Sequence, residues 1–445
     1  MPLPQSSDLH VLLVGNYEYD RQESMQRYAE MLAAGLPALG VTVTMIRPEP
    51  YLGRLKPAGH GLGKWLGYID KFIIFPIRLR WLVRHARRAA PSPIKFRDED
   101  EVSTLSKPFN LNPPLQQRAS APTVHRPPCE PCSQQPSAAP SSGLIVHICD
   151  HSNAMYALHL AGVPHVVTCH DLLAVRSALG HFPGNRVGWA GRRLQNWIAR
   201  GLRHAASVVC DSEATRTDLL ALGGIAASQA TTIHIGLNHP YVVRDEAWLK
   251  TVLASLPQVE QLGPSGYIFH VGGNQWYKNR EGLLRIYFSY VKQGGRLPLV
   301  MAGKPLTTEQ QALVATRPEG ATVIVLGNVS NDQLNALYGR AACLLFPSLQ
   351  EGFGWPVLEA MSAGCPVVCS ARASLPEVGG EAAVYFDPAD EAWATHQLTT
   401  LLAETAEVRA GRRRAGLEQA GLFDTKNMLQ RLVGHYEKLF EAHRC

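Results

Sequence analysis

The sequence predicts an α/β protein with two doubly wound parallel-sheet domains that face each other across a cleft. Two series of short, continuously apolar runs alternate with helical patterns, as in parallel sheets buried on both faces by helices. The 445 residues exceed the usual size of one domain. Hydrophobic residues make up 46% and charged residues 18% of the chain, which is enough apolar material for two cores.

The first series of expected strands belongs to a domain over residues 1–240, with a helix over 21–39 after the first strand. A linker at 241–264 carries a short helix, and the second series belongs to a domain over 265–424. Residues 425–445 have apolar residues at helical spacing, so we expect a helix that docks on the first domain. The expected strands are 10–15, 41–46, 144–149, 165–169, 207–210 and 232–235, then 267–271, 297–302, 322–326, 343–346 and 366–369.

The segment 89–142 interrupts the first domain. It is rich in Pro, Ser, Gln and Ala and lacks hydrophobic periodicity, so it cannot bury enough surface to offset its ordering entropy and is expected to be disordered. Cys129 and Cys132, with His125 nearby, have the spacing of half a zinc site. No second pair completes four ligands, so we interpret the pair as a chance occurrence and predict no metal site.

Charge, cysteine content and the N-terminal sequence point to the cytoplasm. The net charge is +6 with a pI near 8.8, which favours anionic partners but falls short of a nucleic-acid-binding signature. Most of the nine cysteines are single and lie in apolar runs, as free thiols do in a reducing compartment. Neither a secretory signal nor an apolar run long enough to span a bilayer is expected.

The sharpest motif runs from Ser348 to Val368. An apolar strand is followed by a loop with Gly352 and Gly354 and then by Pro356, which is favoured in the first turn of a helix. Glycines let the backbone approach a ligand, and the helix N-terminus offers free N–H groups to anions. Glu351 and Glu359 bracket this turn, and Glu359 would reach ligand hydroxyls. The alternative is a tight strand-to-helix connection with two solvated carboxylates.

A second motif, from Val271 to Leu284, places a basic cluster between a strand and a helix. A diphosphate leaving group needs cations and N–H donors for its developing charge, and Lys278 is placed for that task. A single lysine is more often a solvated surface charge. The other candidates for donor binding in and after this motif are Gly272, Gly273, Asn279, Arg280 and Lys304.

Further polar residues follow strands of the first domain. Ligands of open α/β sheets bind beyond the carboxyl ends of strands, so His170 and Asp171 are expected at the cleft, although a lone histidine there is more often a packing residue. Asp150 and His151 follow another strand in the same way. Gly15, in the loop after the first strand, is the remaining candidate on this side.

The Glu351 motif resembles the E-x7-E donor motif of retaining glycosyltransferases of the GT-B fold in glycosyltransferase family 4. The match is nearly residue for residue from Glu351 to Val368 and extends more loosely through both domains. The resemblance implies that Glu359 holds the nucleotide ribose, that Glu351 faces the donor sugar and its phosphate, and that His170 contacts the donor sugar or the acceptor. It also implies that Gly352, Phe353, Gly354 and Trp355 line the donor pocket in the second domain, while Gly15, Asp150, His151 and Asp171 shape the acceptor side in the first.

The resemblance further implies a retaining transfer of a hexose, with mannose as a guess, from a GDP- or UDP-sugar to a glycan or lipid-linked acceptor in polysaccharide biosynthesis. No other cofactor is expected, and no Asp-x-Asp motif predicts a metal. The family usually has an arginine in the second loop, where this sequence has Asn274, and Arg280 or Lys304 could compensate. An epimerase or phosphorylase on the same fold, or a non-catalytic scaffold with a decayed donor site, stay open as alternatives.

The segment 64–88 interleaves basic residues with aromatic and aliphatic ones. This pattern is typical of a helix that lies on an anionic membrane surface, and it would place the protein at the inner face of the membrane. A helix that covers the first sheet with a basic outer face has the same pattern. Both interpretations stay open.

Overall fold

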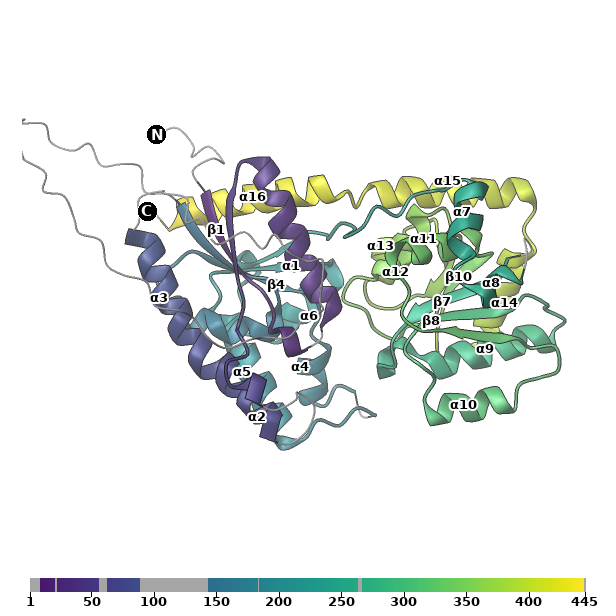
Figure 1. The fold of residues 1–445 in the computed structure, drawn as a ribbon, viewed down its shortest axis with the longest axis horizontal. Helices are drawn as coiled ribbons and strands as arrows, with labels where there is room; N and C mark the ends of the chain where they lie inside the picture. The colour runs from purple at the N-terminus through teal and green to yellow at the C-terminus, as the bar shows by residue number, and fades with distance from the viewer. Residues whose placement is uncertain are drawn as a thin grey trace, which may run out of the picture.

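The computed structural model describes residues 9–20, 22–55, 62–88, 143–182, 184–262 and 266–443. The chain forms two six-stranded parallel sheets, each covered by helices, that lie side by side (Figure 1). The predicted fold class is therefore confirmed. The predicted insertion at 89–142, with Cys129 and Cys132, lies outside the described residues.

The first sheet has the strand order β2-β1-β3-β4-β5-β6. Chain order reverses between β1 and β3, and such a switch point opens a crevice in which α/β proteins bind ligands. The last strand ends at Thr232 rather than continuing to residue 235, because the chain leaves the sheet and passes tightly against Thr425 at Gly236. The elements are β1 (Leu9–Val14), α1 (Glu23–Gly35), β2 (Thr42–Ile46), α2 (Leu62–Ile69), α3 (Phe75–Arg88), β3 (Gly143–Ile148), η6 (His151–His159), β4 (His165–Cys169), α4 (Leu173–Ala178), α5 (Trp189–His204), β5 (Ser207–Cys210), α6 (Glu213–Ala221) and β6 (Ala230–Thr232).

The second sheet has the order β12-β11-β10-β7-β8-β9, with its switch point between β7 and β10. Strand β12 was not predicted, because its three residues are too short to show a pattern. Helices α7 (Glu246–Leu253) and α8 (Pro257–Glu260) precede this sheet. Its elements are β7 (Ile268–Gly272), η9 (Trp276–Lys278), α9 (Arg280–Lys292), β8 (Leu299–Gly303), α10 (Thr308–Ala315), β9 (Val323–Leu326), α11 (Asn331–Arg340), β10 (Cys343–Phe346), α12 (Trp355–Ser362), β11 (Val367–Ser370), α13 (Leu375–Gly379), β12 (Val384–Phe386), α14 (Glu391–Leu402) and α15 (Ala406–Gly421).

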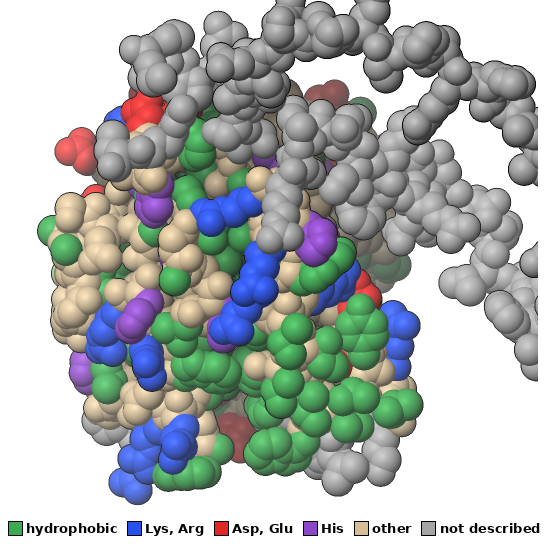
Figure 2. Space-filling model, turned by 90° about the vertical axis from the view of Figure 1, so that its left-hand side faces the viewer, with side chains coloured by type: hydrophobic (Ala, Val, Ile, Leu, Met, Phe, Trp, Pro, Cys, Tyr) green, Lys and Arg blue, Asp and Glu red, His purple; other side chains and the backbone are tan. Residues whose placement is uncertain are grey.

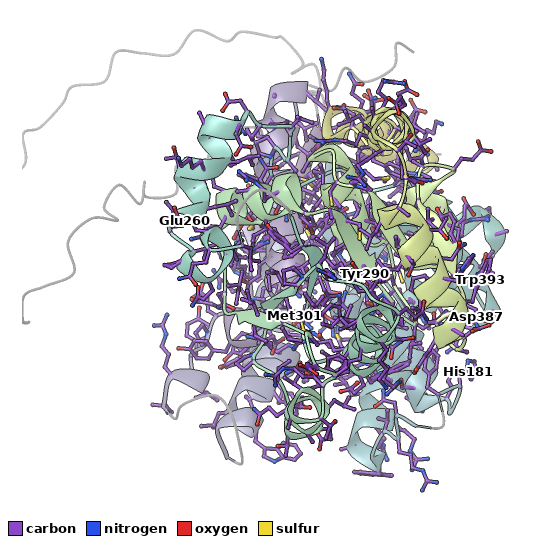
Figure 3. All side chains as sticks on the ribbon, turned by 90° about the vertical axis from the view of Figure 1, so that its right-hand side faces the viewer. His181, Glu260, Tyr290, Met301, Asp387 and Trp393 are labelled. Carbon is purple, nitrogen blue, oxygen red and sulfur yellow. The ribbon has the colours of Figure 1, made fainter. Side chains whose placement is uncertain are left out.

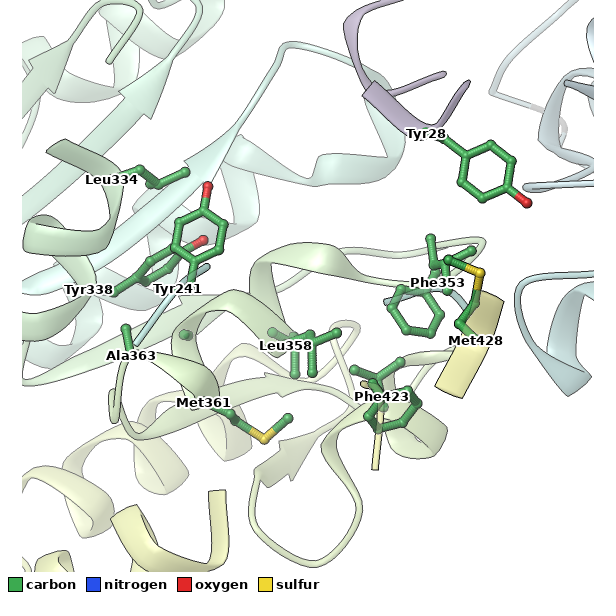
Figure 4. Close-up of a cluster of buried hydrophobic side chains, with 14 of the residues drawn as sticks. Tyr28, Tyr241, Leu334, Tyr338, Phe353, Leu358, Met361, Ala363, Phe423 and Met428 are labelled. Carbon is green, nitrogen blue, oxygen red and sulfur yellow. The ribbon is translucent and has the colours of Figure 1, made fainter. Parts of the chain in front are cut away.

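Helix α16 (Thr425–Ala442) returns from the second domain to lie along the first sheet, as the yellow ribbon in Figure 1 shows. Leu429 fills the space beside Gly35 at the end of α1, and the Tyr436 hydroxyl lies 2.5 Å from Nδ1 of His147 in β3. The hydrophobic core is continuous across this crossing: Phe423 and Met428 lie beside Phe353 of the second domain (Figure 4).

The segment 64–88, expected as one helix, contains a π-helical turn over Asp70–Ile74 between α2 and α3. The buried Asp70 carboxylate accepts hydrogen bonds from the backbone N–H groups of Leu52 (3.0 Å) and Gly53 (2.8 Å) and from the Tyr17 hydroxyl. A π turn inserts one extra residue and rotates the face that follows it. The turn therefore fixes which side of α3 faces solvent.

Candidate active site

Glu351 and Lys278 meet at the switch point of the second sheet. Glu351 follows β10, and Lys278 ends the short helix η9 after β7. Lys278 Nζ lies 2.8 Å from Oε1 and 3.1 Å from Oε2 of Glu351, and Ser348 Oγ donates to Oε1 at 2.6 Å. Both charged side chains are largely buried: that of Glu351 is 9% exposed and that of Lys278 is 15% exposed. The two motifs thus form one ion pair where a ligand of this sheet would lie.

Asn279 holds the loop of the second motif in place. Its backbone is left-handed, with φ at 51°, and its side chain accepts from the N–H of Gly282 as the cap of α9. The same side chain donates to the Pro347 carbonyl at 3.1 Å, at the end of β10. Gly272 and Gly273 lie on the strand side of this loop, where a Cβ would press on His270 and on Gln275. Asn279 therefore fixes the position from which Lys278 reaches Glu351.

Glu359 lies on α12 with only 6% exposure, and its Oε2 accepts from the Tyr338 hydroxyl at 2.8 Å. Burial raises the pKa of Glu359 to about 7, although Tyr338, Arg27 and Lys278 each oppose the rise. Arg27 belongs to α1 of the first domain. A carboxyl that is only partly ionised at neutral pH, and that lies within the field of two cations, is suited to binding hydroxyl groups.

The loop from Gly352 to Trp355 can contact a ligand through its backbone, because its side chains are engaged within the protein. Phe353 is buried against Phe423, with ring centroids 5.6 Å apart (Figure 4). The indole N–H of Trp355 donates to the Gly236 carbonyl at 3.0 Å, which ties the loop to the chain between the domains. Gly354 has φ at 108° and begins α12, with Pro356 in the first turn as expected. The backbone groups of this loop are what remains to contact a ligand.

The two domains are in contact where the loop after β10 meets the loops after β4 and β5. A Cβ on Gly352 would overlap the carbonyl oxygen of His170. The Gly352 carbonyl accepts from Ser212 Oγ at 2.6 Å and from Thr215 Oγ1 at 3.0 Å, both in the first domain. The Glu377 carboxylate accepts from the backbone N–H of Glu213 at 2.9 Å. These contacts bring the predicted His170 and Glu351 motifs together.

His170 is buried and both of its ring nitrogens are engaged. Nδ1 lies 2.6 Å from Asp211 Oδ2, and Nε2 lies 2.8 Å from the Cys149 carbonyl. Burial lowers the pKa of His170, but the charge and hydrogen bond of Asp211, the charge of Asp150 and the Cys149 carbonyl together raise it to about 9. The ring is therefore an imidazolium at neutral pH that donates from both nitrogens. It contributes positive charge and a fixed loop, not a free nitrogen for proton exchange.

The other candidates of the first domain mostly hold loops. Asp150 accepts from Asn16 Nδ2 at 2.6 Å and from the backbone N–H of Ser152 at 2.9 Å, and it caps η6. His151 lies beside it, with Nδ1 3.3 Å from Asp150 Oδ1. Two further residues follow β1 and β4: the Gly15 N–H donates to the Ile46 carbonyl, and Asp171 Oδ1 accepts from the Leu173 N–H. Their place on the acceptor side stays a prediction.

Arg280 and Lys304 are placed differently from one another. Arg280 is 2% exposed, and its Nη1 donates to the Lys304 carbonyl at 2.9 Å and to the side chain of Asn274. Its Nε and Nη2 have no hydrogen-bond partner among the described residues. The Lys304 side chain is exposed. Asn274 thus stands where the family usually has an arginine, and its side chain orients the buried guanidinium of Arg280.

Three residues of the site were missed by the sequence analysis. Asp211 stands directly after β5, so the rule applied to His170 would have found it. Tyr338 lies inside α11 and Arg27 inside α1, where nothing in the local pattern distinguishes them from packing and surface residues. Within the described part of the chain, no group of three or more His, Cys, Asp or Glu side chains could hold a metal ion.

The chain matches two protein families. Residues 257–417 match "Glycosyl transferases group 1", and residues 144–239 match "Glycosyltransferase Family 4". It is 31% identical over 279 residues to the O-antigen chain mannosyltransferase B of Escherichia coli, which covers 62% of this chain and 70% of that protein. It is 25% identical over 285 residues to a serotype-specific mannosyltransferase WbdA of Escherichia coli, covering 62% of this chain. The match spans only 34% of that longer relative.

Solved structures with the same fold include glycosyltransferases. A sucrose-phosphate synthase from Thermosynechococcus elongatus superposes with a TM-score of 0.63 at 17% identity, covering 98% of this chain and 100% of that one. HepE from Anabaena, in complex with UDP-glucose, superposes with a TM-score of 0.60 at 14% identity, covering 96% and 98%. At this identity the likeness shows the fold alone.

Proposed function

The chain belongs to the glycosyl transferases group 1 family and is a GT-B glycosyltransferase, and we propose that it transfers a mannosyl residue from a nucleoside diphosphate sugar to a glycan hydroxyl. The observation that carries the donor site is the Lys278–Glu351 pair at the switch point of the second sheet, with Glu359 buried one turn into the next helix. The mannosyl group is proposed because the relatives at 31% and 25% identity are named as mannosyltransferases. GDP-mannose is accordingly the donor proposed first, and UDP-sugars are the alternative.

Each part of the donor would have its own partners. Glu359 accepts hydrogen bonds from ribose hydroxyls, helped by the nearby charge of Arg27. Lys278 and the backbone N–H groups of the Gly352–Trp355 loop, which leads into α12, bind the diphosphate. Glu351 is ion-paired to Lys278, and the phosphate of the donor replaces the carboxylate as the partner of the ammonium group. The released Glu351 carboxylate then accepts from hydroxyls of the sugar.

The proposed reaction retains the anomeric configuration. As the bond from the sugar C1 to the phosphate oxygen breaks, Lys278 and the backbone N–H groups stabilise the charge that gathers on the diphosphate. The acceptor oxygen bonds to C1 on the same face, and its proton passes to the departing phosphate oxygen. The charged His170 lies at the domain contact beside Gly352, where it adds positive charge on the acceptor side. No protein carboxylate acts as a covalent nucleophile in this scheme.

A product assay tests the proposal. The protein is incubated with GDP-mannose, UDP-glucose and UDP-galactose, each with and without a mannobioside acceptor, and the products are identified by mass spectrometry and NMR. The proposal expects an α-linked mannoside that forms only when the acceptor is present. A donor-sugar epimer formed without acceptor would favour an epimerase, and nucleotide binding without turnover would favour a scaffold. A β-linked product would overturn retention.

We further propose that helix α3 rests on an anionic lipid surface, so that the enzyme works at a membrane. Ile73, in the π turn before α3, and Ile77 and Trp81, on α3, are 56%, 64% and 55% exposed. They lie four residues apart, which makes an apolar stripe along this helical segment. Arg80, Arg84 and Arg87 flank the stripe, and all three are exposed. Figure 2 shows hydrophobic and basic side chains interleaved on this face. Apolar insertion combined with arginine contacts to phosphates is how interfacial helices bind. No helix in the described part of the chain is both long and apolar enough to cross a membrane.

A further inference from the structure

An aromatic corner joins the two domains. Phe182, in the loop after α4, and Trp276, at the start of η9, have ring centroids 4.9 Å apart and ring planes inclined by 51°. Together with Gly184 and Asn185 they line a hollow of about 280 Å³. Trp276 remains 36% exposed. A large aromatic surface is therefore open to a ligand at a junction that neither domain forms alone.

The first-domain half of the corner is held rigidly by α4. The Arg176 guanidinium lies over the Phe182 ring at 4.9 Å from its centroid, and Arg176 Nη1 is fixed by Asp218 Oδ2 at 2.6 Å. The Asn185 side chain donates from Nδ2 to Ser177 Oγ at 2.9 Å. Its Oδ1 is a hydrogen-bond acceptor and the indole N–H of Trp276 is a donor, and both residues line the hollow. The corner therefore combines fixed apolar faces with an acceptor and a donor.

The corner lies beside the groups proposed to do the chemistry. Trp276 precedes Lys278 by two residues, and α4 begins immediately after the His170–Asp171 turn. Tyr277 lies between the two sides: burial raises its pKa, and the carboxylates of Glu351 and Asp171 raise it further. A molecule seated in the hollow would thus lie near the donor-site loops but outside the pair formed by Lys278 and Glu351.

The geometry points to an acceptor subsite at which one sugar ring of the acceptor glycan packs its C–H face on Trp276 and Phe182. This inference rests on the proposed function. Sugar rings carry apolar C–H faces and polar edges, so they suit an aromatic surface rimmed by a few hydrogen-bonding groups. Asn185 Oδ1 and the Trp276 indole N–H bind the hydroxyls at the edge. The volume is close to the lower limit of ligand pockets, about 300 Å³, and fits one monosaccharide unit.

The same contact would exist if the two rings only latched the domains together. A latch would hold the two domains together, so its loss would raise the KM values for donor and acceptor alike and lower kcat. A subsite acts on acceptor binding alone. Within the described part of the chain, the side chain of Phe182 forms no hydrogen bond, ion pair or ring contact with the donor-binding groups Lys278, Glu351 and Glu359. The KM for the donor therefore separates the two roles.

The experiment measures binding of methyl α-mannobioside to the full chain by calorimetry in the presence of GDP, together with the KM values for acceptor and GDP-mannose. The variants are Trp276→Ala, Trp276→Phe and Phe182→Ala. Trp393→Ala is the matched control, because Trp393 is 46% exposed on α14 and lies at the edge of the molecule in Figure 3. Binding requires no turnover, so a failure of the proposed reaction is seen separately from a failure of the subsite.

We expect Trp276→Ala and Phe182→Ala to weaken mannobioside binding about tenfold or more, which is the loss of one good aromatic contact. Trp276→Phe should restore most of the affinity, Trp393→Ala should bind as the wild type, and the KM for GDP-mannose should not move. The inference is overturned if the wild type does not bind the probe, if both alanine variants bind it as the wild type does, or if donor and acceptor KM rise together.

Discussion

The backbone of Gly352 passes so close to the carbonyl oxygen of His170 that no side chain fits between them. Gly352 follows Glu351 in the second domain, and His170 directly follows strand β4 in the first. Ser212 and Thr215 fix the same peptide through its carbonyl. The distance between the donor motif and the first domain is thus set by one glycine, and the predictions below start from this contact.

Gly352→Ala should abolish most activity. The new methyl group overlaps backbone rather than a flexible side chain, so the two loops must separate, and shifts of about 1 Å at a reacting site cost roughly 100-fold in rate. Gly434→Ala, on α16, is the matched control, because a Cβ at this position would have no neighbouring atom within 4 Å. Helix propensity predicts that the control gains stability of up to about 1 kcal/mol. Full activity in Gly352→Ala would show that the contact is not needed.

Glu359→Gln should stabilise the empty protein at pH 8 while it weakens donor binding. The pKa of Glu359 is raised from 4.5 to about 7 in the folded state, so the folded state holds more protons between these values and stability falls as pH rises through this window. The amide removes this loss, which is roughly 3 kcal/mol at most. Urea unfolding at pH 4 and pH 8 measures the difference. Equal stability of the variant and the wild type at pH 8 would contradict the buried, partly protonated carboxyl.

The His170–Asp211 pair should give the same kind of test at higher pH. Because the pKa of His170 is raised from 6.5 to about 9, its contribution to stability is fully present below about pH 6.5 and is lost as pH rises through about 9. Asp211→Asn breaks a buried pair and should cost about 3–5 kcal/mol at pH 7. It should also flatten the decline between pH 7 and pH 10. An unchanged pH profile in the variant would mean that His170 is not held as a cation.

The proposed membrane contact is tested by co-sedimentation with lipid vesicles. Wild-type protein should bind vesicles that contain phosphatidylglycerol but bind phosphatidylcholine vesicles weakly, and added salt should reduce the binding. Ile77→Asp should remove most of this binding. Val408→Asp is the matched control, because Val408 is a similarly exposed apolar residue on α15 of the second domain. Equal loss in both variants, or binding independent of lipid charge, would argue against the stripe on α3.

The sequence predicted those features that depend on local pattern. Buried parallel strands appear as apolar runs, so eleven of the twelve strands in the described part of the chain were expected, although β6 was placed at 232–235 instead of 230–232. The loops after the strands followed from the carboxyl-end rule. The partners within the site could not be predicted, because Tyr338 reaches Glu359 and Asp211 reaches His170 only through tertiary packing. The burial of Phe353 and the tie from Trp355 to Gly236 depend on how the domains and α16 pack. The π turn at Asp70 likewise depends on a loop 17 residues earlier.

The measurement that tests the central claim most directly is release of GDP from GDP-mannose by the wild type, Lys278→Met and Glu359→Gln, with Lys292→Met, at the exposed end of α9, as the matched control. The account predicts that Lys278→Met lowers kcat by about 100-fold or more, the cost of losing one charge-stabilising group. It also predicts that Glu359→Gln mainly raises the KM for the donor and that Lys292→Met stays close to the wild type. Wild-type turnover with no loss in Lys278→Met or Glu359→Gln would contradict the donor site described here.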